Sequence, residues 1–113
     1  MCTQLQLDKI TKEIAQKVHA VLGKRLRNVI LFGSYARGDY DEESDIDIMV
    51  LADVGEEEIY DFQKQINLIS SRTSLAHDIT ISIMLNDKRL FDKRLPVLPF
   101  YRNVVNDGVQ LYE

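Results

Sequence analysis

The sequence predicts an α/β (α+β) fold in which helices flank a small mixed β-sheet. Three short segments, residues 28–32, 46–51 and 78–85, have the apolar runs or the alternation of β-strands. Apolar residues recur every three or four positions in the segments before and between them, which is typical of amphipathic helices. Because helices and strands take turns along the chain, we expect a sheet packed against helices.

The size and composition indicate one globular unit. The chain has 113 residues, of which 45% are hydrophobic and 28% charged, so we expect residues 1–113 to form a single domain. The formal net charge is -4. Because nucleic-acid-binding domains usually present a basic face, we expect no direct binding to nucleic acid.

The chain shows no sign of a membrane or secreted protein. No apolar run approaches the length of a membrane span, and the N-terminal segment is too polar for a signal peptide. Cys2 is the single cysteine, so an intramolecular disulfide is excluded and a reducing compartment fits. We therefore expect a cytoplasmic protein that makes no contact with membranes.

The first expected helix has an apolar stripe that packs in the core. Thr3 and Gln6 match a capping box at its start, and Gly23 is a plausible stop. The apolar positions recur at helical spacing: Leu7, Ile10, Ile14, Val18, Val21 and Leu22.

Two buried strands should follow. Residues 28–32 form an apolar run that ends at Gly33, which indicates a strand buried on both faces. Residues 34–37 resemble a short helical turn, residues 39–44 an acidic loop, and residues 46–51 the second strand.

The second half of the chain repeats the alternation of helix and strand. Asp53 and Glu56 match another capping box, before a helix with Ile59, Phe62, Ile66 and Ile69 on one side. The expected third strand spans residues 78–85. Its apolar face would hold Ile79, Ile81, Ile83 and Leu85, and its other face Asp78, Thr80, Ser82 and Met84.

Two short helices and a strand should close the chain. Residues 87–95 are expected to be helical before Pro96. Pro99 is suited to open a last helix that stops at Gly108, and residues 109–112 can add a short strand.

Gly33 and Ser34 stand where a buried strand turns into a helix. A glycine lets a phosphate approach the backbone, and the N–H groups of the turn together with a serine hydroxyl can hold phosphate oxygens. Alone, the pair is better explained by a tight turn with a helix cap.

Asp45 and Asp47 should project from the same face of a strand. Residues two apart in a strand lie about 6 to 7 Å apart along the chain. Two neighbouring carboxylates at the mouth of an apolar strand are costly unless a cation neutralises them, and Mg²⁺ prefers carboxylate oxygens. The alternative is a solvated strand end. Asp78 would join them only if the second and third strands are neighbours; otherwise it is a turn residue.

Read together, these residues resemble a known family. Gly33-Ser34, followed after ten residues by Asp45-Ile46-Asp47, is similar to the Gly-Ser…Asp-x-Asp signature of the polymerase-β-like nucleotidyltransferase superfamily. The flanking segments 31–38 and 44–48, with the closing segment 99–109, resemble its minimal nucleotidyltransferase branch. In some members of that branch the domain is the antitoxin of a toxin–antitoxin pair and adenylylates a HEPN-domain toxin ribonuclease.

The resemblance implies a role for each motif residue. Gly33 and Ser34 would hold the triphosphate of ATP, while Asp45 and Asp47 would bind two Mg²⁺ ions together with Asp78 as third carboxylate. These three aspartates would be the catalytic residues, with Asp78 as candidate base. Arg37 either steadies a phosphate or forms a surface salt bridge with Asp39, Asp41 or Glu42.

The implied reaction transfers AMP from ATP to a hydroxyl, such as that of a tyrosine, on a HEPN-domain toxin that associates with this chain. Two alternatives remain open on the sequence alone. The chain could neutralise its toxin by binding without catalysis, or it could transfer AMP to a small molecule.

Overall fold

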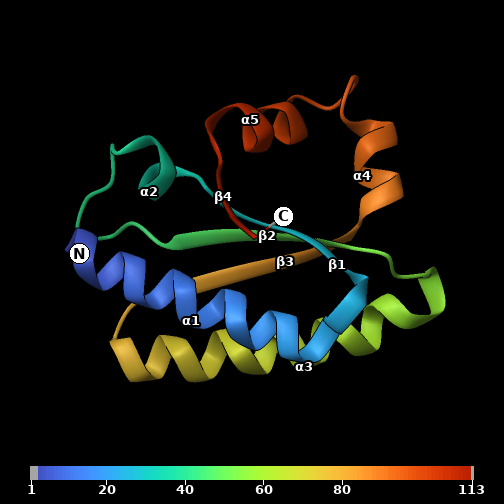
Figure 1. Ribbon diagram of the computed structural model, residues 1–113. Helices are drawn as coiled ribbons and strands as arrows, with labels where there is room; N and C mark the ends of the chain where they lie inside the picture. The colour runs from blue at the N-terminus through green and yellow to red at the C-terminus, as the bar shows by residue number, and fades with distance from the viewer. Residues whose placement is uncertain (1–2, 113) are drawn as a thin grey trace.

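The computed structural model describes residues 3–112, which form six helical segments and four strands (Figure 1). In chain order the elements are α1 (Gln4–Leu22), η1 (Gly23–Arg25), β1 (Leu26–Phe32), α2 (Ser34–Arg37), β2 (Ile46–Ala52), α3 (Glu56–His77), β3 (Ile81–Asp87), α4 (Lys88–Arg94), α5 (Pro99–Asp107) and β4 (Val109–Tyr112).

The four strands form one mixed sheet in the order β3-β2-β1-β4. β1 is antiparallel to both β2 and β4, whereas β2 is parallel to β3. The expected mixed sheet is therefore confirmed. The two central strands come from the continuous apolar runs, because only these strands have neighbours on both edges.

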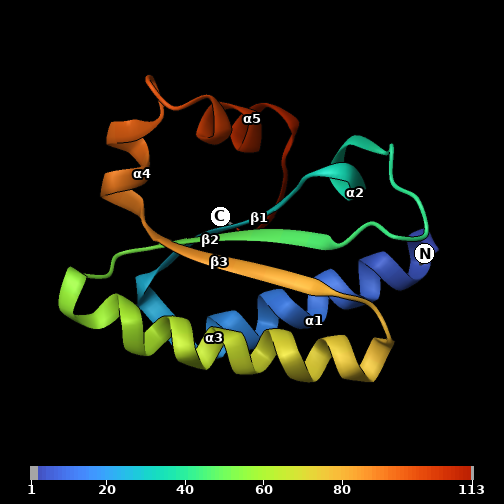
Figure 2. The ribbon, with the colours of Figure 1, turned by 180° about the vertical axis from the view of Figure 1, so that it is seen from behind.

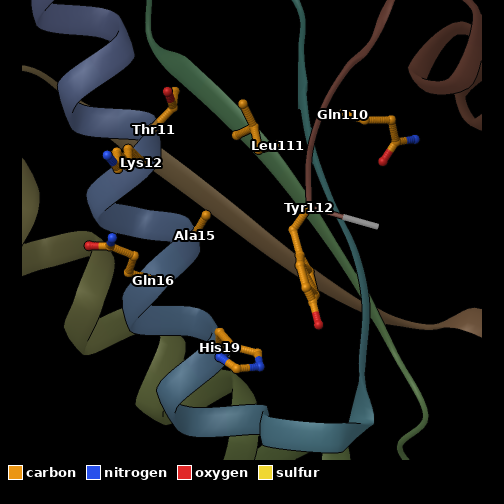
Figure 3. A pocket seen from close by; sticks show the side chains of 8 residues that line it. All are labelled: Thr11, Lys12, Ala15, Gln16, His19, Gln110, Leu111 and Tyr112. Atoms are coloured by element: carbon orange, nitrogen blue, oxygen red, sulfur yellow. The ribbon is translucent and has the colours of Figure 1, made fainter.

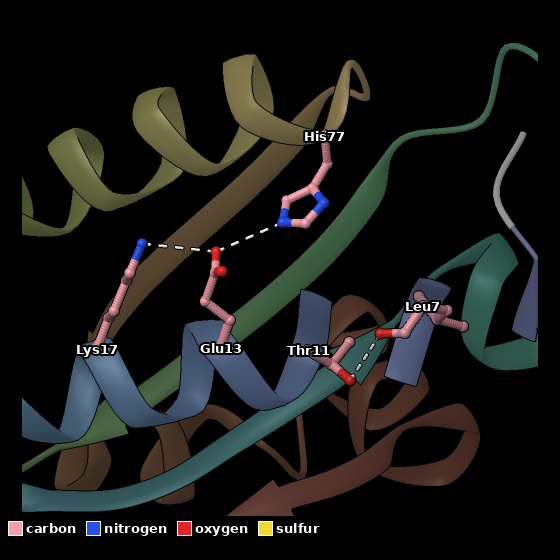
Figure 4. Close-up of polar contacts among 5 residues, drawn as sticks. All are labelled: Leu7, Thr11, Glu13, Lys17 and His77. Carbon is pink, nitrogen blue, oxygen red and sulfur yellow. Dashed lines mark hydrogen bonds and ion pairs between the residues drawn. The ribbon is translucent and has the colours of Figure 1, made fainter. Parts of the chain in front are cut away.

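One face of the sheet is covered by the two long helices. α1 and α3 lie side by side beneath it (Figures 1 and 2). Glu13 of α1 links them at their surface, because its carboxylate lies 3.6 Å from Nε2 of His77 on α3; the same carboxylate lies 3.5 Å from the Lys17 ammonium one turn further along α1 (Figure 4). The core of this face is apolar and includes Ile10, Ile14, Val18, Ile46, Ile48, Val50, Ile66, Ile81, Ile83 and Leu85.

The opposite face carries the two short helices. α4 and α5 stand over it in both views (Figures 1 and 2). Its buried cluster is small and consists of Ile30, Met49, Leu51, Phe91 and Val104. The rings of Phe91 and Tyr101 stack with centroids 4.5 Å apart, which ties α4 to α5. Much of this face therefore lacks the helical cover of the first.

The helix starts follow the sequence signals in part. The capping box of Thr3 and Gln6 is formed, with both reciprocal hydrogen bonds. The capping box expected from Asp53 and Glu56 is wrong, because Gly55 is the N-cap of α3 and no side chain caps it. Asp53 instead accepts a hydrogen bond of 3.2 Å from Arg27.

The third strand starts later than its alternation indicates. The expected strand over residues 78–85 is wrong at both ends, because β3 spans Ile81–Asp87. α3 continues to His77, and Asp78 is its C-cap in a left-handed conformation with φ 50° and ψ 46°. Asp78 therefore lies in a turn rather than on the polar face of the strand. β1 also begins two residues before the expected Asn28.

The closing elements match expectation more closely. The Asp87 side chain caps α4 by accepting from the Arg89 N–H at 3.1 Å. Pro99 opens α5, Gly108 follows its last residue, and β4 is present. Across residues 3–112, none of the helices combines the length and the apolar character that crossing a membrane requires.

Candidate functional site

The motif residues converge at one end of the sheet. Because β1 runs antiparallel to β2, and β2 parallel to β3, the last residues of β1 meet the first residues of β2 and β3 at this end. α2 and the loop of residues 38–45 join β1 to β2 there, and α3 ends nearby (Figures 1 and 2). The site is thus built on the ends of three neighbouring strands.

A glycine is required at position 33 by the backbone conformation there and by the neighbouring side chain of Asp47. Its φ of 76° and ψ of -158° lie in a region that side chains strongly disfavour. A Cβ placed on it would stand 2.6 Å from Oδ2 of Asp47, which is closer than carbon and oxygen can approach. The missing side chain therefore makes room for a carboxylate of the second motif. The sequence signal found this glycine but not this contact.

The turn after Gly33 is held by its own backbone. The N–H groups of Ala36 and Arg37 donate to the Gly33 carbonyl at 3.1 Å, and that of Gly38 donates to the Ser34 carbonyl at 2.9 Å. Ser34 is half-buried at the first position of α2. The turn therefore fixes Ser34 next to Gly33, on the side of β1 where Asp47 lies.

Asp47 is the most perturbed carboxylate of the site. It is half-buried on the face of β2 that also carries Met49, between its strand partners Phe32 and Ser82. Burial raises its pKa, the nearby charge of Asp45 raises it further, and the Arg37 guanidinium opposes the shift. Asp45 itself is exposed and directly precedes β2. The expectation that both carboxylates project from one face of a strand is therefore met only for Asp47, because Asp45 lies before the first residue of β2.

These two carboxylates suit a divalent cation. A bound cation would offset both their repulsion and the burial of Asp47, and Mg²⁺ is commonly held by one or two carboxylates together with phosphate oxygens. The structure does not, however, gather three acids. Within residues 3–112, no group of three or more His, Cys, Asp or Glu side chains is arranged to hold a metal ion.

Asp78 lies to one side of this pair. It shares with Asp45 the lining of a cavity of about 430 Å³, in which Asp47 takes no part. The residues beside the two motif carboxylates, one just before β3 and one within it, carry hydroxyls instead. The Ile46 N–H donates to the Thr80 carbonyl at 3.0 Å, and Ser82 is the strand partner of Asp47. Here the chain departs from the three-carboxylate arrangement that the resemblance implies.

Arg37 forms one of the surface pairs that the sequence left open. Its Nε lies 3.2 Å from Oδ2 of Asp39, and both side chains are exposed. An exposed pair of this kind contributes about 0 to 1 kcal/mol, so it does not bind Arg37 firmly. The guanidinium also lowers the pKa of Asp47, and Arg37 lines a cavity together with Gly33.

A smaller cavity opens between Gly33 and α5. Its volume is about 170 Å³, and its lining comprises Phe32, Gly33, Arg37, Phe100, Asn103, Val104 and Asp107. Sequence reasoning missed the α5 residues of this set. A signal was available, because positions 100, 103 and 107 recur at helical spacing and must share one side of a helix that opens with Pro99.

Another cavity, of about 470 Å³, lies between α1 and β4 (Figure 3). His19 and Tyr112 face each other across it with ring centroids 5.4 Å apart. None of its lining residues belongs to the Gly-Ser or Asp-x-Asp segments. The volume of a cavity therefore does not indicate where the motif residues lie.

The chain is similar to known proteins along nearly its whole length. A family model described as "Nucleotidyltransferase domain" matches residues 7–106. Two proteins of Methanocaldococcus jannaschii, provisionally named as protein adenylyltransferases MJ0604 and MJ0141, are also similar. The first is 38% identical over 105 residues, which cover 93% of this chain and 97% of the relative. The second is 43% identical over 107 residues, with 95% and 100% covered.

Two solved structures share the architecture. A protein of Sulfolobus solfataricus, provisionally described as a nucleotidyltransferase, superposes with a TM-score of 0.66 at 26% identity, covering 97% of this chain and 83% of that one. A toxin–antitoxin structure with AMP-PNP gives a TM-score of 0.54 at 23% identity, with 89% and 72% covered. At this identity the second likeness shows the fold alone.

Proposed function

The chain belongs to the nucleotidyltransferase family, and on that premise we propose that it is a Mg²⁺-dependent protein adenylyltransferase. It would transfer AMP from ATP to a hydroxyl group of a partner protein. The observation that carries this proposal is the contact of Gly33 with the Asp47 carboxylate, because it joins the two motifs in one place. A phosphate held by the turn at Gly33 and Ser34 would then lie beside Asp45 and Asp47.

The reaction requires little covalent chemistry from the protein. The acceptor oxygen attacks the α-phosphorus of ATP, the bond from that phosphorus to the bridging oxygen breaks, and pyrophosphate leaves. Gly33 and Ser34 would hold the triphosphate, and Arg37 would steady one of its phosphates. Positioning and charge neutralisation supply most of the reduction in the barrier.

The metal would be held by Asp45 and Asp47. When bound, Mg²⁺ would neutralise the negative charge of the phosphates while that charge shifts toward the leaving group. Two protein carboxylates together with phosphate oxygens are enough for one ion. We propose Asp78 as the base that takes the proton of the acceptor hydroxyl. It would act from the cavity that it shares with Asp45, and a second ion would require it to move closer to the pair.

The proposed acceptor is a protein, in agreement with the names of the two M. jannaschii relatives. We propose a HEPN-domain toxin as partner and a tyrosine as its acceptor residue, a choice supported by the resemblance of the motifs to antitoxin nucleotidyltransferases. ATP would be the donor and the cytoplasm the compartment. One observation favours a second function: because residues 3–112 hold no three-carboxylate group, the chain could silence its partner by binding alone.

The test combines the purified chain, ATP, Mg²⁺ and a HEPN-domain protein encoded beside it. We expect the mass of the partner to increase by one or more AMP units, and chelation of the metal to abolish the increase. Asp45→Asn and Asp47→Asn should each reduce transfer by at least about 100-fold. Asp92→Asn is the matched control, because Asp92 is exposed on α4 and, within the described part of the chain, pairs only with Lys88.

The two functions predict different results in this experiment. A stable complex with an unmodified partner, whatever the state of Asp45 and Asp47, would establish binding alone and refute catalysis. Asp78→Asn tests the base separately: it should slow transfer while leaving the affinity for ATP and Mg²⁺ unchanged. Equal rates for this variant and the unaltered protein would remove Asp78 from the reaction.

A further inference from the structure

A basic and apolar surface lies where α4 leads into α5, over the second face of the sheet (Figures 1 and 2). Residues 88–102 contain five lysines or arginines and one acid, Asp92, so this segment carries a net charge of +4 in a chain whose net charge is -4. The cations of the chain therefore gather in α4, in the connection that follows it and in the first half of α5.

Three of these cations have no acidic partner within the described part of the chain. Lys93, Arg94 and Arg102 are exposed, and none of them takes part in the ion pairs that form among residues 3–112. The other two cations of the segment each pair with a neighbouring aspartate. The three unpaired charges can therefore meet carboxylates that another molecule supplies.

Exposed apolar residues lie between these cations in the chain. Val97 and Leu98 keep 71% and 39% of their surface exposed. The N–H groups of both donate to the Arg94 carbonyl, at 3.0 and 2.9 Å, and the Arg102 N–H donates to the Leu98 carbonyl at 3.2 Å. These hydrogen bonds keep each arginine one backbone turn away from Leu98. We term Lys93, Arg94, Val97, Leu98 and Arg102 the α4–α5 patch.

The α4–α5 patch lies apart from the motif residues. The α5 residues that line the cavity beside Gly33 occupy positions 100, 103, 104 and 107, whereas Arg102 lies on the other side of that helix. No residue of the patch lines this cavity or the one that Asp45 and Asp78 share. A molecule can therefore bind to the patch without occupying either cavity.

The composition of the patch selects the kind of molecule that fits it. Exposed arginines beside apolar residues are typical of protein–protein interfaces, where guanidinium groups pair with carboxylates and apolar side chains are shielded from water. A nucleic acid or an anionic membrane presents its charge over a wide surface, which a chain of net charge -4 repels outside the patch. The matching occupant is a protein segment with carboxylates on both sides of an apolar residue.

A second copy of the chain does not meet this description. Its acidic loop, residues 39–45, contains five acids but only one apolar side chain, that of Tyr40. The ring of Tyr40 stacks on Tyr35 of the same molecule, with centroids 4.3 Å apart. The loop therefore offers carboxylates to the arginines, but no available apolar side chain to Val97 and Leu98.

We propose that the α4–α5 patch is the docking surface for a partner protein, and that it binds an acidic segment of that partner in which an apolar residue lies between carboxylates. This inference rests on the proposed function for the existence of a partner. It adds where the partner is held and which charge its docking segment carries. Arg94 and Arg102 pair with the carboxylates, while Leu98 contacts the apolar residue.

The test uses two labelled helical peptides of equal length. One peptide places a glutamate one turn before and one turn after a leucine, and the other has lysines in place of the glutamates. Binding to the full chain is followed by fluorescence anisotropy at low ionic strength, without ATP or Mg²⁺. We expect the glutamate peptide to bind at least about tenfold more tightly, because it forms ion pairs where the lysine peptide meets like charges. A uridine oligonucleotide and phosphatidylserine vesicles serve as the other anionic probes.

A charge-reversal variant isolates the patch. Arg94→Glu combined with Arg102→Glu should reverse the preference between the two peptides. Lys9→Glu combined with Lys12→Glu makes the same change in charge on α1, which covers the other face of the sheet, and should leave the preference as it is. Both of these lysines are exposed and, within the described chain, form no ion pair. Leu98→Ala should weaken the binding of the glutamate peptide without reversing the preference.

The outcomes separate docking from catalysis. If neither peptide binds, or if the preference survives reversal at Arg94 and Arg102, the docking surface is refuted whether or not AMP is transferred. Tighter binding of the oligonucleotide or the vesicles than of the glutamate peptide would identify a phosphate-binding surface and also overturn the proposal. Dimerisation that the reversal abolishes, measured by sedimentation, would assign the patch to a second copy and overturn it as well. A preference for the glutamate peptide that reversal abolishes, without transfer of AMP to any acceptor, would support the docking surface and refute the proposed catalysis.

Discussion

The two faces of the sheet differ in how completely helices cover them, and adjacent residues of β2 show the consequence. Ile48 points to the face that α1 and α3 cover and is fully buried. Asp47, one residue earlier, points to the other face and stays partly accessible beside Gly33. On that face Met84 and Phe100 keep 40% and 44% of their surface exposed. Stability and chemistry are thus assigned to opposite sides of one strand.

Ile48→Ala should give the largest loss of stability. The substitution leaves a void beneath the sheet, where α1 and α3 pack tightly, and typically costs about 2 to 5 kcal/mol. Chemical denaturation measures the free energy of unfolding. If Asp47→Ala proved as destabilising as Ile48→Ala, the division between the two faces would be wrong.

Gly33→Ala should damage both stability and activity. The positive φ of this backbone costs about 1 to 3 kcal/mol for a residue with a side chain, and the new methyl group would displace the Asp47 carboxylate. Gly38→Ala is the matched control, since Gly38 has φ 86° but no atom within 4 Å of an added Cβ. It should lose some stability and keep AMP transfer. Equal transfer by both variants would contradict the role of the Gly33–Asp47 contact.

Thr73→Val, a change within the helices that cover the first face of the sheet, should stabilise the protein. Thr73 is fully buried on α3, and its hydroxyl has no hydrogen-bond partner within residues 3–112. A buried hydroxyl without a partner costs about 1 to 3 kcal/mol, and valine has nearly the same shape. A higher melting temperature with unchanged AMP transfer is expected. A lower melting temperature would show that the hydroxyl is satisfied after all.

Asp47→Asn should abolish transfer while raising the melting temperature. Burial and the Asp45 charge raise the pKa of Asp47 above its ordinary value, so its ionised form opposes folding at neutral pH. The folded chain holds that proton more tightly than the unfolded chain, and this penalty therefore fades as the pH falls through the raised pKa. The difference between the two proteins should shrink on acidification. A gap that widens in acid would contradict this sign.

Much of the fold was predictable because its signals are local. The capping box at Thr3, the apolar runs of β1 and β2, and Pro99 at the start of α5 each act within a few residues. The start of β3 was not predictable in this way. Alternation of apolar residues continues back through Ile79, yet the long helix α3 holds Asp78 in its C-cap, and the Ile79 N–H donates to the Ser74 carbonyl.

The candidate site was predictable where its residues are close in sequence. The spacing from Gly33 to Asp47 belongs to one pair of adjacent strands, so the motif brings its own residues together, and the family that it indicates is confirmed. The positions of the other site residues depend on the order of the strands in the sheet. The β3 register that places Ser82 beside Asp47, and the approach of α5 to Gly33, depend on tertiary packing that no local pattern encodes.

The antiparallel pairing of β1 with β2 also has a consequence for how the protein acquires its site. Residues 33 to 47 are brought together by closing a loop of modest length, which carries a small entropic cost. Contacts of low sequence separation tend to form early, so the Gly33–Asp47 contact should be in place once this hairpin forms. The part of the site that depends on β3 should form later, because the whole of α3 separates β2 from β3 in the sequence.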